Sequence, residues 1–157
     1  MFGLFSKPKL QHARFGEMIF RRGYWEVEAD YLGYRNVLLR LPGSRDGIGE
    51  QADVLCGELE RRYPLITERI AQVLFKESYQ PVRRAIRKGD YPGDPGGIPR
   101  LKSVDDVWSN LRLASVDFGV EFDKNIIELG YGADWEIEHR LGIGIKDWRF
   151  EYFNGSV

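Results

Sequence analysis

The chain has 157 residues, of which 43% are hydrophobic, 13% aromatic and 30% charged, and its formal net charge is -1. These values are typical of one ordinary globular domain and exclude a disordered or fibrous chain. The near-neutral charge removes the electrostatic argument for extensive nucleic-acid binding, which relies on many Lys and Arg side chains. The single cysteine, Cys56, cannot form an internal disulfide, and one thiol with two histidines is too few for a common structural zinc site.

The first 16 residues mix small apolar side chains with Lys7, Lys9 and Arg14. Their apolar run is too short for a secretory signal, and no run in the chain approaches the roughly 20 apolar residues of a membrane span. The segment could lie on a membrane surface, but a loose leader is the simpler interpretation. We therefore expect a leader over residues 1–16 and a single domain over residues 17–157, in the cytoplasm and without a cofactor.

The first half of that domain predicts a hairpin followed by helices. Apolar and polar residues alternate over 25–31 and 36–41, as in two half-buried strands joined by a turn. Helical spacing then places Cys56 on the core face of a helix over 52–63, where a small buried hydrophobe is expected rather than a reactive thiol. Pro64 predicts the start of a second helix, and Pro81 predicts that this helix breaks or restarts, with a short helix over 82–88.

The second half predicts a loop and four strands. Residues 89–99 are rich in Gly and Pro and lack the spacing of a phosphate-binding loop. Strand patterns follow over 111–120, 125–131, 135 or 137 to 145, and 148–153, separated by short turns that favour antiparallel neighbours. The whole order predicts an α+β fold: a mostly antiparallel curved sheet, made of an N-terminal hairpin and a C-terminal four-strand meander, with two or three helices packed on one face.

The densest group of ionisable residues lies in the third of these strands. The odd positions from Ile137 read Ile, His, Leu, Ile and Ile, so strand alternation predicts that His139 lies on the buried side, opposite Glu136 and Glu138. A metal site fails on this geometry unless a bulge re-aims His139. An acid–base pair of His139 with Asp134 or Glu138 stays open, although no Ser or Cys nucleophile is recognisable. A structural histidine that donates to a carboxylate or carbonyl is the favoured interpretation.

Charge is also uneven along the chain. Residues 117–138 contain seven acidic residues and one basic residue, which could form a charged binding face if they gather in space. Arg83, Arg84, Arg87 and Lys88 form the most basic patch. A solvated helix face explains this patch, while an anion, partner or nucleic-acid site would require salt-sensitive binding.

The segment from Asp134 to Gly142 resembles the W-[DE]-x-E-H-x-L-G segment of small, uncharacterised bacterial domains. It reads Asp-Trp-Glu-Ile-Glu-His-Arg-Leu-Gly, and the likeness covers about the C-terminal third of the chain. Some such domains are grouped with immunity proteins of bacterial polymorphic toxin systems. The resemblance therefore implies a cytoplasmic binding protein rather than an enzyme, and it assigns no catalytic role to Glu136, Glu138, His139 or Gly142.

Together these observations predict a non-enzymatic protein-binding domain with a charged surface and a Trp or Tyr anchor such as Trp25, Tyr131 or Trp135. The alternative is a small hydrolase or metal-dependent enzyme that uses His139 with nearby carboxylates. The expected partner is a protein, with no nucleic acid and no membrane span. The expected binding residues are Asp134, Trp135, Glu136, Glu138, His139 and Arg140, and the basic patch is a second expected site.

Overall fold

Nine strands form one sheet in the computed structural model, which describes residues 7–157. The order is β1-β2-β3-β4-β6-β7-β8-β9, and the short β5 pairs with β4. All neighbours are antiparallel except β4 and β6, which are parallel. The expected α+β fold with a mostly antiparallel sheet is confirmed. The strands are β1 (Lys9–His12), β2 (Gly16–Arg21), β3 (Tyr24–Tyr31), β4 (Tyr34–Ser44), β5 (Gly47–Ile48), β6 (Leu111–Phe118), β7 (Ile126–Ala133), β8 (Glu136–Lys146) and β9 (Arg149–Asn154).

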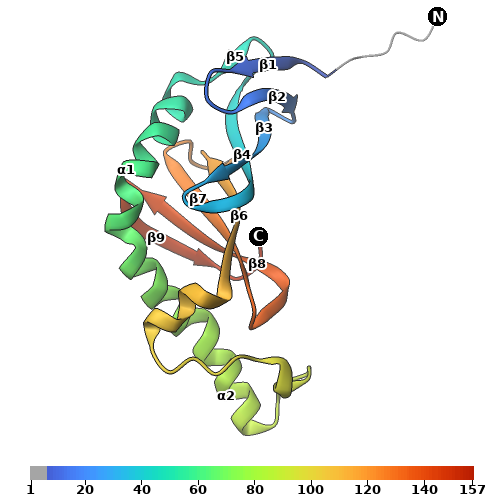
Figure 1. The fold of residues 1–157 in the computed structure, drawn as a ribbon, viewed down its shortest axis with the longest axis vertical. Helices are drawn as coiled ribbons and strands as arrows, with labels where there is room; N and C mark the ends of the chain where they lie inside the picture. Colours follow the sequence, from blue (N-terminus) through green and yellow to red (C-terminus); the bar gives the residue numbers. More distant parts are fainter. Residues whose placement is uncertain (1–6) are drawn as a thin grey trace, which may run out of the picture.

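One continuous helical segment connects β4 to β6. It consists of α1 (Glu50–Val73), the π-helical turn η1 (Leu74–Tyr79) and α2 (Gln80–Lys88). Helix α1 runs along one side of the curved sheet, while α2 extends past it (Figure 1). The apolar sides of α1 and the strands enclose the core, which includes Cys56, Leu59, Ile70, Val37, Leu39, Val116, Leu129 and Ile143. Two short 3-10 turns, η2 (Pro95–Gly97) and η3 (Val104–Asn110), lead back to the sheet.

The predicted helix start at Pro64 is wrong, because α1 passes through this proline. A short helix does begin next to Pro81, as expected, although the chain enters it from η1 without leaving the helical conformation. Proline lacks the N–H that would bond to the carbonyl four residues earlier, so a helix must adjust its hydrogen bonding around it. Pro81 is the second residue of α2, which follows directly after η1, and in this first helical turn the missing donor costs least.

The loose leader expected over residues 1–16 overlaps the sheet. Strand β1 pairs with β2 from Lys9 opposite Ile19 to His12 opposite Gly16. Residues 9–12 are therefore a strand, and residues 1–6 lie outside the described part of the chain. The sequence pattern missed β1 because four residues are too few to display a period of two.

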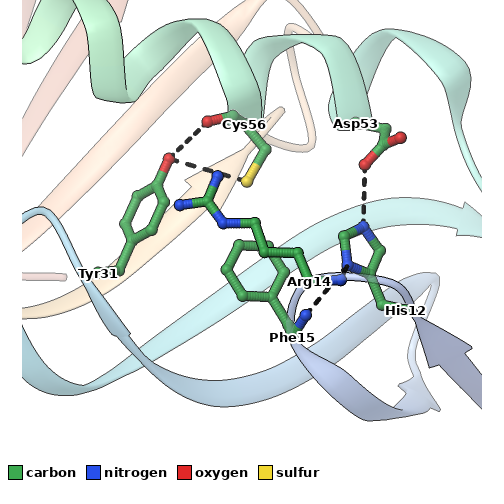
Figure 2. A network of polar contacts seen from close by, with 6 residues as sticks. All are labelled: His12, Arg14, Phe15, Tyr31, Asp53 and Cys56. Carbon is green, nitrogen blue, oxygen red and sulfur yellow. Dashed lines mark hydrogen bonds and ion pairs between the residues drawn. The ribbon is translucent and has the colours of Figure 1, made fainter.

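Side chains of the β1–β2 turn attach this hairpin to α1 (Figure 2). His12 Nδ1 accepts the backbone N–H groups of Arg14, at 3.1 Å, and Phe15, at 3.3 Å. The ring proton must therefore sit on Nε2, which donates to Asp53 Oδ1 on α1 at 3.0 Å. The Arg14 guanidinium lies 5.0 Å from the Phe15 ring and bonds to Glu60 further along the helix. His12 thus links the start of the sheet to α1.

Cys56 lies beneath this attachment and is 2% exposed. Its backbone carbonyl accepts the Tyr31 hydroxyl at 2.7 Å, and its Sγ lies 3.7 Å from the same hydroxyl (Figure 2). Burial raises the pKa of the Cys56 thiol to about 11, so very little thiolate exists near neutral pH. The expectation of a small buried hydrophobe is confirmed.

Candidate functional site

The hairpin of β7 and β8 carries the six binding residues expected from the sequence between Asp134 and Arg140. Tyr131 pairs with Leu141, and Ala133 pairs with Glu136. Residues 137–140 of β8 therefore stand opposite Gly132 alone, which makes them a large β-bulge. All four are exposed, whereas Leu141 and Ile143 beyond the bulge are buried.

This bulge overturns the prediction that His139 lies on the buried side. Strand alternation does not continue through residues 137–140, and Ile137 is 88% exposed while the His139 side chain is about half exposed. Glu136 closes the bulge, because its Oε1 accepts the backbone N–H groups of Glu138 at 3.0 Å and His139 at 3.2 Å. The same oxygen lies 3.6 Å from His139 Nδ1. His139 therefore shares one carboxylate with its own backbone, out in solvent.

Trp135 anchors the hairpin from the opposite side. It is 1% exposed, its indole N–H donates to Ser78 Oγ on η1 at 2.8 Å, and its ring meets the Tyr79 ring edge-on at 5.6 Å. The other proposed aromatic anchors, Trp25 and Tyr131, are also buried, at 1% and 0% exposure. These aromatic rings stabilise the core, and none of the three is free to contact a partner in this conformation.

A hollow of about 990 Å³ opens beside the bulge and faces solvent. Five of the six expected binding residues line it, and the sixth, Trp135, does not. Arg112 on β6 also lines it and donates from Nη1 to Asp134 at 3.0 Å. Glu138 and Arg140 form no ion pair among residues 7–157. The lining residues are Gly96, Gly97, Ile98, Pro99, Asn110, Arg112, Gly132, Ala133, Asp134, Glu136, Ile137, Glu138, His139, Arg140 and Val157.

The chemistry available in this hollow is limited. Its lining contains no Ser, Thr, Cys, Tyr or Lys side chain that could act as a nucleophile, and only Asp134, Glu136, Glu138 and His139 could move a proton. Within the described part of the chain, no group of three or more His, Cys, Asp and Glu side chains is placed to hold a metal ion. The arrangement offers a protruding apolar side chain among charges of both signs.

The basic patch lies apart from this hollow. Arg83, Arg84, Arg87 and Lys88 all belong to α2, and none of them lines it. Arg84, Arg87 and Lys88 are exposed, and none of the four pairs with a carboxylate among residues 7–157. The structure therefore presents two separate surfaces rather than one combined site.

The acidic segment 117–138 does not gather into one patch either. Asp123 pairs with Lys146 at 2.7 Å, Asp134 with Arg112, and Glu136 with its own bulge. Asp117 joins a row of polar side chains on the sheet face away from α1. This row was not visible in the sequence, because it depends on the register of strands distant along the chain.

The row crosses the sheet from β3 to β9. Glu26, Arg40, Asp117 and Glu128 are successive register partners, and Glu128 then faces Gly144, which pairs with Tyr152. Arg40 donates to Glu26 at 3.3 Å and to Asp117 at 2.9 Å, and the Tyr152 hydroxyl donates to Glu128 at 2.5 Å.

Burial shifts the ionisation of this row. It raises the pKa of Asp117 above its ordinary value, although Arg40 opposes the shift. Burial, and after it the hydrogen bond to Glu128, also raises the pKa of Tyr152. Asp117 and Tyr152 therefore hold their protons more tightly in the fold than in water, and the row is a partly desolvated network across the sheet.

Comparisons of the chain with protein-family models, with curated proteins and with solved structures find no match. Among residues 7–157, neither α1 nor α2 combines the length and the apolar character needed to cross a membrane.

Proposed function

We propose that the chain is a non-enzymatic protein-binding domain whose contact surface is the 137–140 bulge and the adjoining hollow. The observation that carries this proposal is the exposure of Ile137, at 88%, on a protrusion with Glu138, His139 and Arg140. A large apolar side chain held in solvent beside charged residues is a common anchor for a protein partner. The charges would govern encounter and specificity.

The bulge suits this role because its support is rigid. Trp135 fixes one end to Ser78, and the Glu136 carboxylate holds the backbone of residues 138 and 139. A surface that is ordered before binding loses less conformational entropy when a partner docks. The resemblance of residues 134–142 to a segment of immunity-type domains extends the proposal to a bacterial, cytoplasmic protein that neutralises a toxin partner.

Site-specific photo-cross-linking in the cells that naturally produce the protein tests this function. A photoreactive residue at Ile137 should capture one defined protein, whereas the same residue at Val54, 55% exposed on α1, should not. Excess wild-type protein should suppress the product, and excess Ile137→Asp protein should not. Identical products at both positions, or none at position 137, would contradict the proposal.

An immunity role makes a further demand on the captured partner. Expression of that partner alone should arrest growth, and co-expression of the wild-type chain should restore it. The Ile137→Asp variant should fail to restore growth while remaining folded. A harmless partner would leave the binding function in place and remove the immunity role.

A second candidate function follows from one contact, the 3.6 Å approach of His139 Nδ1 to Glu136 Oε1 at the edge of the hollow. This pair would serve a small hydrolase as its acid and base. NMR titration of the His139 ring in wild type and in Glu136→Gln distinguishes the two functions. Coupled titration of the ring with the carboxylate, together with a shift on adding Zn²⁺, would favour the enzyme.

A further inference from the structure

Strand β9 lies at the end of the sheet and leaves one edge open. Its only strand partner among residues 7–157 is β8. An edge strand presents N–H and C=O groups in the spacing that an additional strand requires. The opposite end of the sheet, β1, has four residues, whereas β9 has six, from Arg149 to Asn154. Strand β9 is therefore the longer edge for an incoming segment.

A groove runs along this edge between α1 and β9, which lie side by side (Figure 1). It consists of two hollows of about 370 and 490 Å³ that meet at Arg69 and Phe150. Ile66, Trp148 and Phe150, which are partly exposed, line the first hollow, while Ile70, Ile143 and Ile145 lie buried at its floor. The second hollow continues past Val73, Tyr152 and Phe153. At the rim, Leu65 is 78% exposed.

The groove is bordered by arginines that stack on its aromatic rings. The Arg62 guanidinium lies 4.9 Å from the centre of the Trp148 ring, and that of Arg69 lies 5.3 Å from the centre of the Phe150 ring. Arg62 and Arg69 are seven residues apart on α1, and therefore on one side of the helix. A stacked guanidinium keeps the N–H groups along its edge free to bind a carboxylate in a bidentate manner.

These arginines have no acidic partner of their own. Arg62, Arg69 and Arg149 form no ion pair with any carboxylate among residues 7–157, in contrast to Arg14, which binds Glu60. Lys76 adds a fourth cation to the border, although it pairs with Glu77 at 3.5 Å. The border thus carries unpaired positive charge above an apolar floor, next to an unpaired strand edge.

We propose that this groove and the β9 edge bind an extended, acidic peptide segment of another protein, which adds to the sheet as a further strand. Backbone hydrogen bonds to β9 supply affinity, apolar side chains of the segment cover Leu65, Ile66 and Phe150, and its carboxylates pair with Arg62, Arg69 and Arg149. A second copy of this chain fits less well, because pairing two β9 edges would bring two sets of the same arginines together. This site is separate from the 137–140 bulge.

A synthetic probe tests the site. The probe is a capped decapeptide of Val, Thr and Glu, with Glu on both faces of the extended strand, and its control carries Lys in place of every Glu. In an NMR titration of the full chain, the Glu peptide should bind saturably and shift the β9 amides and the Arg62 and Arg69 side-chain signals. The Lys peptide should bind at least about tenfold more weakly.

Matched variants separate the groove from general electrostatics. Arg69→Glu should lower the affinity for the Glu peptide at least about tenfold, because it replaces an attraction with a repulsion. Arg61→Glu makes the same charge change on α1 at a residue outside the groove and should leave affinity within about twofold. Circular dichroism melts establish that both variants remain folded. Arg69→Lys, which keeps the charge, should recover part of the affinity.

N-methylation of the peptide tests strand addition itself. In a segment that extends the sheet, every second N–H group points towards β9, and the others point away. Two peptides are therefore compared, each N-methylated at one of the two alternate sets of residues (the two phases). Methylation of the set that faces β9 should abolish binding, and methylation of the other set should be tolerated. Tolerance of both phases, absence of saturable binding, equal effects of Arg69→Glu and Arg61→Glu, or a dimer formed through β9 in sedimentation would each overturn the proposal. Ile137→Asp should leave peptide binding unchanged, so the failure of either proposed surface can be recognised separately.

Discussion

At the residue scale, a single carboxylate determines which side chains of β8 reach solvent. Glu136 uses one oxygen to hold the backbone N–H groups of residues 138 and 139, in the way that Asp and Asn side chains close local turns. Residues 137–140 therefore belong to the bulge, whereas regular strand alternation would place them in turn on the two faces of the sheet. Ile137 is displaced outward as a result, although Ile143 in the same strand is 0% exposed.

Truncation of these two isoleucines should therefore have very different effects. Ile143→Ala removes buried methyl groups and leaves a cavity, so the free energy of unfolding should fall by about 2–5 kcal/mol. Ile137→Ala removes exposed atoms and should change it by less than about 0.5 kcal/mol. Urea denaturation of both variants checks the difference. A comparable loss in the two would mean that Ile137 is buried and that the bulge is absent.

Gly144 is required by the packing of Tyr152 across the sheet. A Cβ atom at Gly144 would overlap the Tyr152 ring, which lies over this position to reach Glu128. Gly144→Ala should force the ring aside and lower the free energy of unfolding by about 1–3 kcal/mol.

Gly132→Ala is the matched control on β7. The nearest atom to its added Cβ would be Arg112 Nη2 at 3.6 Å, which is ordinary contact, and this variant should be neutral within about 0.5 kcal/mol. Equal urea denaturation midpoints for the two variants would contradict the placement of Tyr152.

At the element scale, the helical segment of residues 50–88 continues through two prolines that were expected to divide it. Apolar contacts with the sheet hold it together: buried side chains occur before Pro64 at Cys56 and Leu59, and after it at Ile70 and Leu74. The free energy of burying these side chains exceeds the cost of one missing backbone hydrogen bond, which is about 3 kcal/mol. Local helix signals could not anticipate this balance.

Pro64 should consequently be a source of instability. It lies exposed inside α1, so replacement by Ala loses no packing and restores a backbone donor. Pro64→Ala should raise the free energy of unfolding by about 2 kcal/mol, after allowing for the greater freedom of the unfolded chain. Pro81→Ala, in the first turn of α2, should gain less. Urea denaturation measures both, and a larger gain at Pro81 would mean that Pro81, rather than Pro64, lies in a helix interior.

At the scale of the whole molecule, the parallel pairing of β4 with β6 joins the two halves of the sheet. The helical connection between these strands allows them to lie parallel. The pairing brings Arg40 to Asp117 across 77 positions of sequence and completes the polar row. The pKa values of the row therefore depend on the assembly of the full sheet.

The pH dependence of stability should show this coupling. Burial raises the pKa of Asp117 above its ordinary value of 3.8, so the folded state binds this proton more tightly than the unfolded chain does. The stabilisation is fully present below about pH 3.8 and is lost as the pH rises through the folded pKa. The free energy of unfolding of wild type, relative to Asp117→Asn, should therefore fall with rising pH.

Asp123→Asn is the control with the opposite sign. The hydrogen bond from Lys146 lowers the pKa of Asp123, so its stabilisation appears above the unfolded pKa and is lost as the pH falls. Relative to this variant, wild type should gain stability with rising pH. Urea denaturation across the acidic range measures both slopes, and slopes of the same sign would contradict the buried position of Asp117.

The sequence alone determined the elements of this protein that depend on local geometry. Alternation located β3, β4 and the four C-terminal strands to within a few residues, and helical spacing placed Cys56 in the core. It also directed attention to residues 134–140, five of whose six expected members line one hollow. These results are accessible because the periods of strands and helices are set by the backbone near each residue.

Tertiary structure alone decided register, edges and exposure. The row from Glu26 to Tyr152, the open β9 groove and the attachment of β1 to α1 all join residues that are distant along the chain. The exposure of His139 and Ile137 depends on which of two arrangements of this strand is more stable, and local sequence patterns do not show which one that is. Burial of the Trp135 indole against Ser78 and Tyr79, with a bulge closed by Glu136, replaced the continuation of a regular strand.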